Sequence, residues 1–192
     1  MKRIIVALTG ASGMAYALRL LQLLQQQQTE IHLIVSPQGA GNLRRELDLD
    51  FDPANPASLG LRPEGVFCHR HDDLAAPPAS GSARFDGMVI VPCSVGRLGR
   101  LAAGTAEDLI SRAADVCLKE RRPLVLVVRE TPLSAIHLRN MLTLTEAGAV
   151  VLPACPSFYH RPQSVEELVD TVVERALDHL GLPRSEARRW GG

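Results

Sequence analysis

The sequence has few aromatic residues, no closely spaced cysteine pair, no long apolar run and no net charge. Its 192 residues include one Trp, two Tyr and four Phe. That is few for a protein that stacks single-stranded bases on aromatic rings. Basic and acidic side chains are equal in number, at 21 each, so no net positive field draws the chain to nucleic acid or anionic lipid. We therefore expect no nucleic-acid partner.

The cysteines and the apolar segments predict a cytoplasmic protein. The four cysteines are scattered and form no Cys-x-x-Cys pair, which argues against a disulfide or zinc framework and favours a reducing compartment. No run of about 20 apolar residues is present to span a membrane. The first residues, MKRIIVAL, lead directly into a predicted strand and lack a signal-peptide pattern.

Apolar runs alternate with helical patterns along the chain. At 46% hydrophobic residues, 1–192 is expected to form one domain. Continuous apolar runs predict buried parallel strands at 4–8, 31–35, 88–92, 123–128 and 149–153. Helical patterns cover 14–26, 106–120, 133–148 and 164–181, the last opening on a Ser164/Glu167 capping box. This alternation predicts a doubly wound α/β sheet, and residues 51–87, rich in Pro and Gly, predict an irregular loop.

Doubly wound sheets bind ligands at the carboxyl ends of their strands. The segment TGASG (9–13) follows the first strand with small residues and a hydroxyl, which suits an anion or cofactor turn at a helix N-terminus. The alternative is that Ser12 only caps the helix. After the fourth strand, Arg129 suits a phosphate or carbonyl and Glu130 suits proton transfer. A surface ion pair between them is the alternative.

Other polar segments carry weaker signals. Cys93, in PCSVGR after the third strand, is either a nucleophile or, as we favour, a small buried residue. The stretch HRHDD (69–73) offers metal-ligand residue types, but a polar loop is the preferred interpretation. Tyr159, in an aromatic loop, has a hydroxyl that can donate to a phosphate.

Taken together, these motifs resemble those of the flavin prenyltransferases of the UbiX type. TGASG, the strand-end PCS, RAADVCLKERRPLVLVVRETP, HLRNM and FYHRPQS occur in that family's order and spacing. The resemblance spans about residues 3–182 and is strongest over 109–163. It implies a flavodoxin-like, Rossmann-like fold of three layers. It also implies a homo-oligomer, typically a dodecamer, with active sites at subunit junctions.

The resemblance also implies an activity. Such enzymes join the dimethylallyl group of dimethylallyl monophosphate to N5 and C6 of reduced FMN, without a metal. The prenylated FMN then serves a UbiD-type decarboxylase, often in ubiquinone synthesis. The implied flavin contacts are Gly10, Ala11, Ser12, Ser36, Ser94, Val95, Gly96, Arg97 and Arg129. The implied prenyl-phosphate clamp is Arg112, Lys119, Tyr159 and Arg175.

Three residues are implied to act near the reacting atoms: Ser12 near flavin N5, Glu130 in phosphate departure and proton loss, and Glu46 as a second acid. The chain departs from the family at Pro37, where many relatives have Lys, and at Leu74, where some have Trp. It also has Arg97 where relatives usually have Thr or Ser, and Glu107-Asp108 in place of a polar pair that often contains Asn. We expect Arg97 and Glu107 to form a compensating ion pair.

Two other functions fit parts of the pattern. One is an FMN-dependent enzyme similar to the peptidyl-cysteine decarboxylases, whose strand-end PASANT-like motif differs from PCSVGR here. The other is a non-catalytic flavin carrier, which would need the flavin contacts but not Glu130, Lys119 or Arg175.

Overall fold

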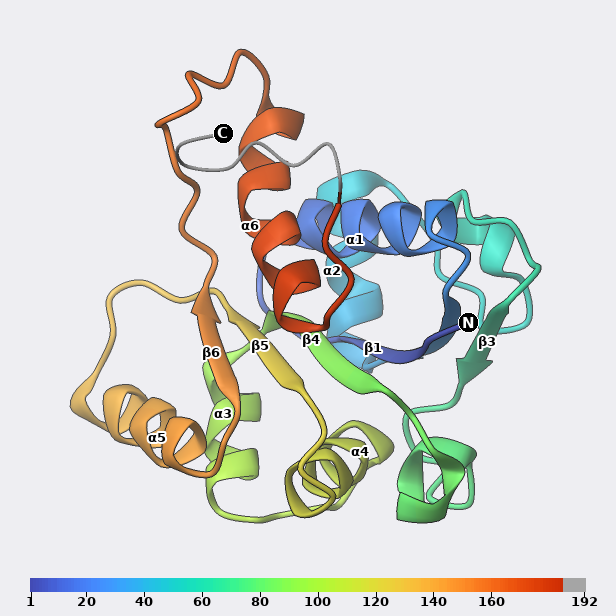
Figure 1. Ribbon diagram of the computed structural model, residues 1–192, viewed down its shortest axis with the longest axis vertical. Helices are drawn as coiled ribbons and strands as arrows, with labels where there is room; N and C mark the ends of the chain where they lie inside the picture. The colour runs from blue at the N-terminus through green and yellow to red at the C-terminus, as the bar shows by residue number, and fades with distance from the viewer. Residues whose placement is uncertain (185–192) are drawn as a thin grey trace.

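Six parallel strands form one sheet in the computed structural model, which describes residues 1–184. The strands lie in the order β3-β2-β1-β4-β5-β6 (Figure 1), and every neighbouring pair is parallel. Their bounds are β1 Arg3–Leu8, β2 Glu30–Val35, β3 Val66–His69, β4 Gly87–Cys93, β5 Leu124–Val128 and β6 Val150–Pro153. The predicted doubly wound sheet is confirmed.

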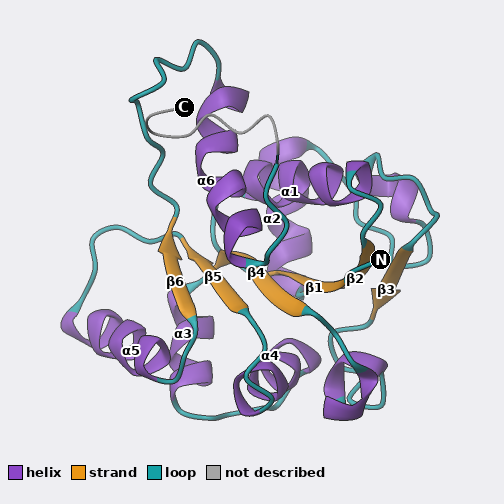
Figure 2. Cartoon of the chain, in the orientation of Figure 1, coloured by secondary structure: helices purple, strands orange, loops and turns teal. Residues whose placement is uncertain are grey.

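Helices cover both faces of the sheet, so the three-layer prediction is confirmed as well. Figure 2 shows α1, α2 and α6 on one side and α3, α4 and α5 on the other. Their bounds are α1 Met14–Gln26, α2 Pro37–Leu47, α3 Val95–Ala102, α4 Leu109–Lys119, α5 Ala135–Glu146 and α6 Val165–His179. None of these helices is long and apolar enough to cross a membrane.

Each central strand feeds two hydrophobic cores, which explains its uninterrupted apolar sequence. In β1, Ile4, Val6 and Leu8 belong to the core beneath α1 and α6. Ile5 and Ala7 belong to the core beneath α3 and α4. Because successive side chains of a strand point to opposite faces, a strand covered on both faces must be apolar at every position.

Three elements were not predicted from the sequence, and one strand is less buried than expected. Helix α2 begins at a Ser36 cap followed by Pro37 at its first position, but its two glycines weaken the helical pattern. Helix α3 has only eight residues. Strand β3 lies inside the region 51–87 that was predicted to be irregular. The strand predicted at 149–153 is present as the edge strand β6, but it has no fully buried residue, so only its predicted burial is wrong.

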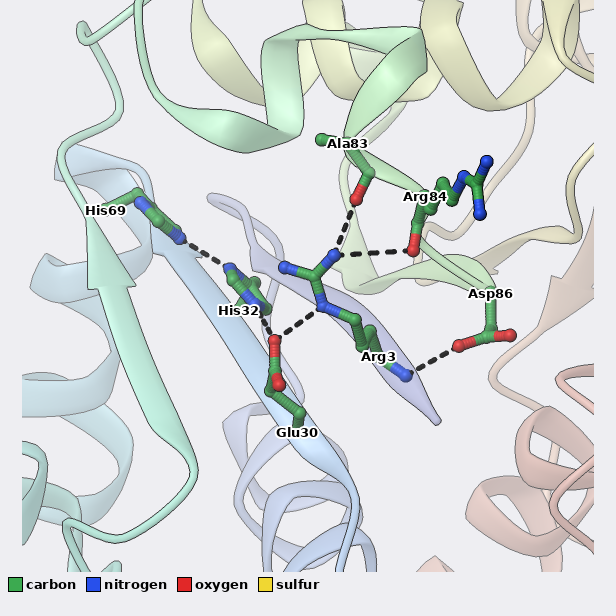
Figure 3. Close-up of polar contacts among 7 residues, drawn as sticks. All are labelled: Arg3, Glu30, His32, His69, Ala83, Arg84 and Asp86. Atoms are coloured by element: carbon green, nitrogen blue, oxygen red, sulfur yellow. Dashed lines mark hydrogen bonds and ion pairs between the residues drawn. The ribbon is translucent and has the colours of Figure 1, made fainter. Parts of the chain in front are cut away.

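The buried imidazole of His32 ties the edge strand β3 to the centre of the sheet (Figure 3). His32 Nδ1 lies 2.8 Å from His69 Nε2 on β3, and His32 Nε2 lies 2.8 Å from Glu30 Oε1. Arg3 Nε of β1 donates to the same Glu30 oxygen at 2.6 Å. The His32 ring also packs edge-on against Phe85, with the centroids 4.6 Å apart. This polar chain therefore crosses three adjacent strands.

Candidate functional site

The carboxyl ends of the strands gather the candidate residues along one edge of the sheet. The chain runs outward from β1 through β2 to β3, then returns to β4 on the other side of β1. The topological switch point therefore lies at the adjacent carboxyl ends of β1 and β4, and open α/β sheets bind their ligands outside such strand ends. The β1–α1 turn and the start of α3 both lie there.

The β1–α1 turn depends on a glycine that no other residue replaces easily. Gly13 has a φ of +118°, and a Cβ placed on it would come within 2.9 Å of the Tyr16 ring. Gly13 is also the N-cap of α1, and no side chain caps the helix from that position. The interpretation of Ser12 as a helix cap is therefore wrong, and its exposed side chain is left at the turn.

The first amides of α1 bind the carboxylate of Glu46 instead. Glu46 Oε2 accepts hydrogen bonds from the backbone N–H of Gly13 at 2.9 Å and of Met14 at 2.8 Å. A negative charge at a helix N-terminus is favourable because the helix dipole is positive there. Since Glu46 comes from α2, this contact brings the predicted second acid directly to the turn.

Hydroxyl groups join the turn to the neighbouring strands. Thr9 Oγ1 donates to Pro92 O at 2.8 Å and accepts from Ser94 N at 3.0 Å. Ser94 is the N-cap of α3 and accepts from Arg97 N. Ser36 is buried and caps α2 by accepting from Gly39 N at 3.0 Å. The sequence identified the serines, but Thr9 was missed, although it opens the TGASG motif.

Arg129 and Glu130 lie at the same edge without bonding to each other. Arg129 Nε donates to Ser12 O at 3.2 Å, so its guanidinium reaches the β1–α1 turn. Glu130 is exposed and accepts from Thr131 N at 3.0 Å. No ion pair within residues 1–184 involves either side chain. The alternative of a surface pair between them is therefore wrong.

The side chain of Arg97 is buried against the start of α4. It is 5% exposed, and its Nη1 donates to Asp108 Oδ1 at 2.7 Å and to Ser111 Oγ. The expected ion pair with Glu107 is wrong, because the adjacent Asp108 takes that place. Although burial alone would raise the pKa of Asp108, hydrogen bonds from Arg97 and the Ser111 amide hold it below its ordinary value.

Two residues of the predicted phosphate clamp lie on α4, against the segment PPASGS (77–82), which forms parts of two short 3-10 helices. Arg112 Nε donates to Ala79 O at 3.1 Å, and its Nη1 pairs with Asp115 at 2.8 Å. Lys119, at the end of α4, pairs with Glu120 beside Gly81. Arg122, which the sequence did not single out, donates to Gly81 O and fixes the same loop.

The other two clamp residues belong to the opposite side of the sheet. Arg175 lies on α6 and pairs with Asp178 at 3.0 Å. Tyr159 lies in the long segment between β6 and α6, which projects from the body in Figure 1, and its side chain is 75% exposed. Because α4 and α6 cover opposite faces of the sheet, one chain does not gather all four clamp residues.

Cysteine chemistry and metal binding find little support in this structure. Cys93 is fully buried, and burial raises the pKa of its thiol to about 12, so its interpretation as a buried residue is the better one. The HRHDD stretch is divided, since His69 bonds His32 while Arg70 pairs with Asp72. Within residues 1–184 no group of three or more potential ligands is arranged around a metal position.

Comparisons with known proteins agree on one family. A family model described as Flavoprotein matches residues 1–177. The flavin prenyltransferase UbiX of Pseudomonas aeruginosa is 50% identical over 99% of this chain and 94% of its own length.

Solved structures of similar proteins extend the comparison. The structure of AnUbiX (PadA1) in complex with FMN and dimethylallyl pyrophosphate has a TM-score of 0.91 and 46% identity, covering 100% of this chain and 98% of that one. A dodecameric FMN-dependent UbiX-like decarboxylase from Escherichia coli O157:H7 has a TM-score of 0.88 and 42% identity, covering 99% of this chain and 100% of that one. The FMN-dependent cysteine decarboxylase TvaF is 16% identical with a TM-score of 0.62, a likeness of fold alone.

Proposed function

The chain belongs to the flavoprotein family, among its UbiX-type flavin prenyltransferases, and from this premise we propose that it prenylates reduced FMN. The donor is dimethylallyl monophosphate, and the products are prenylated FMN and phosphate. The carbon–oxygen bond of the donor breaks, with its electron pair leaving on phosphate. The same carbon bonds to N5, which releases its proton. The C=C double bond of the prenyl group takes up a proton on its inner carbon, and the dimethyl-substituted carbon, left with the positive charge, bonds to C6 as C6 loses its proton.

The convergence of Ser12, Glu46, Arg129 and Glu130 at one strand edge is the observation that carries this proposal. Arg129 reaches the turn that presents Ser12, and Glu46 holds the amides of that turn. Glu130 follows Arg129 and has no cationic partner within residues 1–184. A non-catalytic carrier would need the turn and the cation but not an exposed carboxylate beside them.

The residues at the switch point fit a bound flavin. Within residues 1–184 the Arg129 side chain makes one hydrogen bond, through Nε, which leaves its other guanidinium N–H groups available for an electron-rich ligand. A Cβ placed on Gly96, in the first turn of α3, would meet no atom within 4 Å, so that surface is open. The residues proposed to hold FMN are Gly10, Ala11, Ser12, Ser36, Ser94, Val95, Gly96, Arg97 and Arg129.

When bound, reduced FMN supplies the two electron-rich positions, N5 and C6, that take up the prenyl group. The protein's part is to place them and to control protons. We assign to the Ser12 hydroxyl a hydrogen bond near N5, and to Glu46 the fixing of the turn that presents it. Glu130 is assigned to donate a proton to the departing phosphate and to accept the proton from C6.

The phosphate clamp proposed from the resemblance is completed by other copies of the chain. A monophosphate leaves poorly unless cations and proton donors neutralise its charge. The proposed clamp is Arg112, Lys119, Tyr159 and Arg175. Lys119 lies at the end of a helix that runs back toward the amino ends of the strands, away from Glu130. Only a neighbouring subunit can therefore bring such a residue to the flavin edge.

Exposed apolar side chains on α5 support this assembly, which we propose to be a dodecamer. Only Leu144 of α5 is buried, while Ile136, Leu138 and Leu142 are 64%, 53% and 58% exposed. Exposed apolar side chains gathered on one helix suit burial against another subunit. The dodecameric relative described above has the same fold.

The domain, the compartment and the partner of the enzyme follow from its sequence. We assign residues 1–192 to one flavoprotein domain and the protein to the cytoplasm, a choice supported by its four free cysteines. The product is assigned to a UbiD-type decarboxylase, as the family resemblance implies.

The test is mass spectrometry of the flavin after anaerobic incubation with reduced FMN and dimethylallyl monophosphate, without added metal. Gain of one prenyl unit is expected, and the pyrophosphate donor run in parallel identifies the preferred substrate. A cysteine-containing peptide incubated with oxidised FMN tests the decarboxylase alternative. If FMN binds and returns unmodified with every prenyl donor, the transferase proposal fails.

A further inference from the structure

A buried arginine joins the start of α3 to the start of α4. Both contacts of the Arg97 guanidinium use the same nitrogen, Nη1, which donates to Asp108 and Ser111. Asp108 is the N-cap of α4 and also accepts from Ser111 N at 2.8 Å. One cation therefore connects the first turns of two successive helices in the β4–β5 crossover.

The backbone of Arg97 belongs to the proposed flavin-binding segment, whereas its side chain is buried against α4. Arg97 N donates to the Ser94 hydroxyl at 3.3 Å, closing the first turn of α3. Ser94 N is in turn bonded to Thr9, directly before the β1–α1 turn. The contacts of the Arg97 side chain therefore help to fix the positions of the Val95 and Gly96 backbone N–H groups in the first turn of α3.

Burying the Arg97 guanidinium costs the folded protein stability. Arg97 Nε has no hydrogen-bond partner within residues 1–184. A buried guanidinium whose N–H groups are not all hydrogen-bonded lowers the stability of the fold. An apolar side chain would fill the same space at a smaller cost in free energy. Such an arrangement suits a position where a fixed geometry matters more than stability.

We propose that Arg97 is a positioning residue for the flavin: it locks the N-terminal turn of α3 against α4 through Asp108 and Ser111, and so presents the amides of Val95 and Gly96 to FMN. This role rests on the proposed function, since it requires FMN at the switch point. The side chain itself makes no contact with the flavin. Substitution at Arg97 should therefore act through the geometry of the 94–97 segment.

The experiment measures FMN affinity by quenching of flavin fluorescence, beside thermal unfolding of each FMN-free protein. Arg97→Met is expected to raise the Kd for FMN about tenfold or more. Arg97→Lys should recover part of the affinity, because a single nitrogen makes both contacts. The matched control is Arg3→Met, which removes a partly buried arginine at the amino ends of the strands. It should lower the unfolding temperature while leaving the Kd within about twofold.

Ser111→Ala removes one contact without leaving a buried charge unpaired, and keeps the proposal testable if Arg97→Met does not fold. It is expected to raise the Kd about two- to fivefold. If the altered proteins fold and bind FMN as tightly as the unaltered one, Arg97 is structural only and the proposal is overturned. If the unaltered protein itself binds no FMN, the proposed function fails, and that result is distinct from equal binding by all variants.

Discussion

Lowering the pH should destabilise the folded chain through the His32–His69 pair. His32 Nε2 donates to the ionised Glu30, so His32 Nδ1 is the acceptor and His69 Nε2 the donor of the bond between the two rings. Burial, followed by the neighbouring His32, lowers the pKa of His69 from 6.5 to about 4, although Asp73 opposes this. Burial also lowers the pKa of His32, although the hydrogen bond to Glu30 and its negative charge act to raise that pKa.

The sign of the effect follows from proton binding. Between pH 6.5 and 4 the unfolded chain binds a proton at His69 that the folded chain does not. The stabilisation is therefore fully present above pH 6.5 and is lost as the pH falls toward 4. A pKa lowered from 6.5 to about 4 corresponds to at most about 3 kcal/mol. Because His69 is only partly buried, we expect solvent screening to leave about 1–2 kcal/mol.

The assay is chemical denaturation followed by circular dichroism at several pH values between 7.5 and 4.5, at fixed protein concentration. His69→Gln keeps an N–H donor for His32 but does not titrate. The stability of the unaltered protein relative to this variant should fall by about 1–2 kcal/mol over that range. His71→Gln, two residues along the chain, is the control. A difference between the unaltered protein and His69→Gln that stays constant with pH would refute the reasoning.

Three further results are expected. Glu130→Gln should slow prenyl transfer about a hundredfold or more while FMN affinity is unchanged; a variant as fast as the unaltered protein by mass spectrometry of the flavin would remove Glu130 from the chemistry. Arg19→Met should lower the free energy of unfolding by about 1 kcal/mol. The reason is that Arg19 joins α1 to α6 through two hydrogen bonds to Asp170, of 2.6 and 2.7 Å, and a denaturation midpoint that does not move would show the pair to be neutral. Ile136→Glu should yield smaller species in light scattering, and an unchanged mass would place the interface elsewhere than on α5.

The fold could be predicted where the local pattern and the tertiary environment agree. Strand β1 and helix α1 were predicted to within one residue, because a strand buried on both faces is apolar throughout and an amphipathic helix has a clear stripe. Helix α2 was missed, since its stability comes from the Ser36 cap and from packing of Leu43 rather than from helix propensity. Strand β3 was missed because four residues at a sheet edge carry too little pattern.

The sequence by itself determined which functional groups lie at the candidate site. The TGASG turn, Arg129 and Glu130 had to lie at the carboxyl edge, because parallel strands place the residues that follow them together. The tertiary structure alone decided which partners those groups take. The first N–H groups of α1 donate to Glu46 and not to Ser12. The guanidinium of Arg97 pairs with Asp108 and not with Glu107. Such pairings depend on how separate helices pack against one another, and the spacing of residues along the chain does not encode that packing.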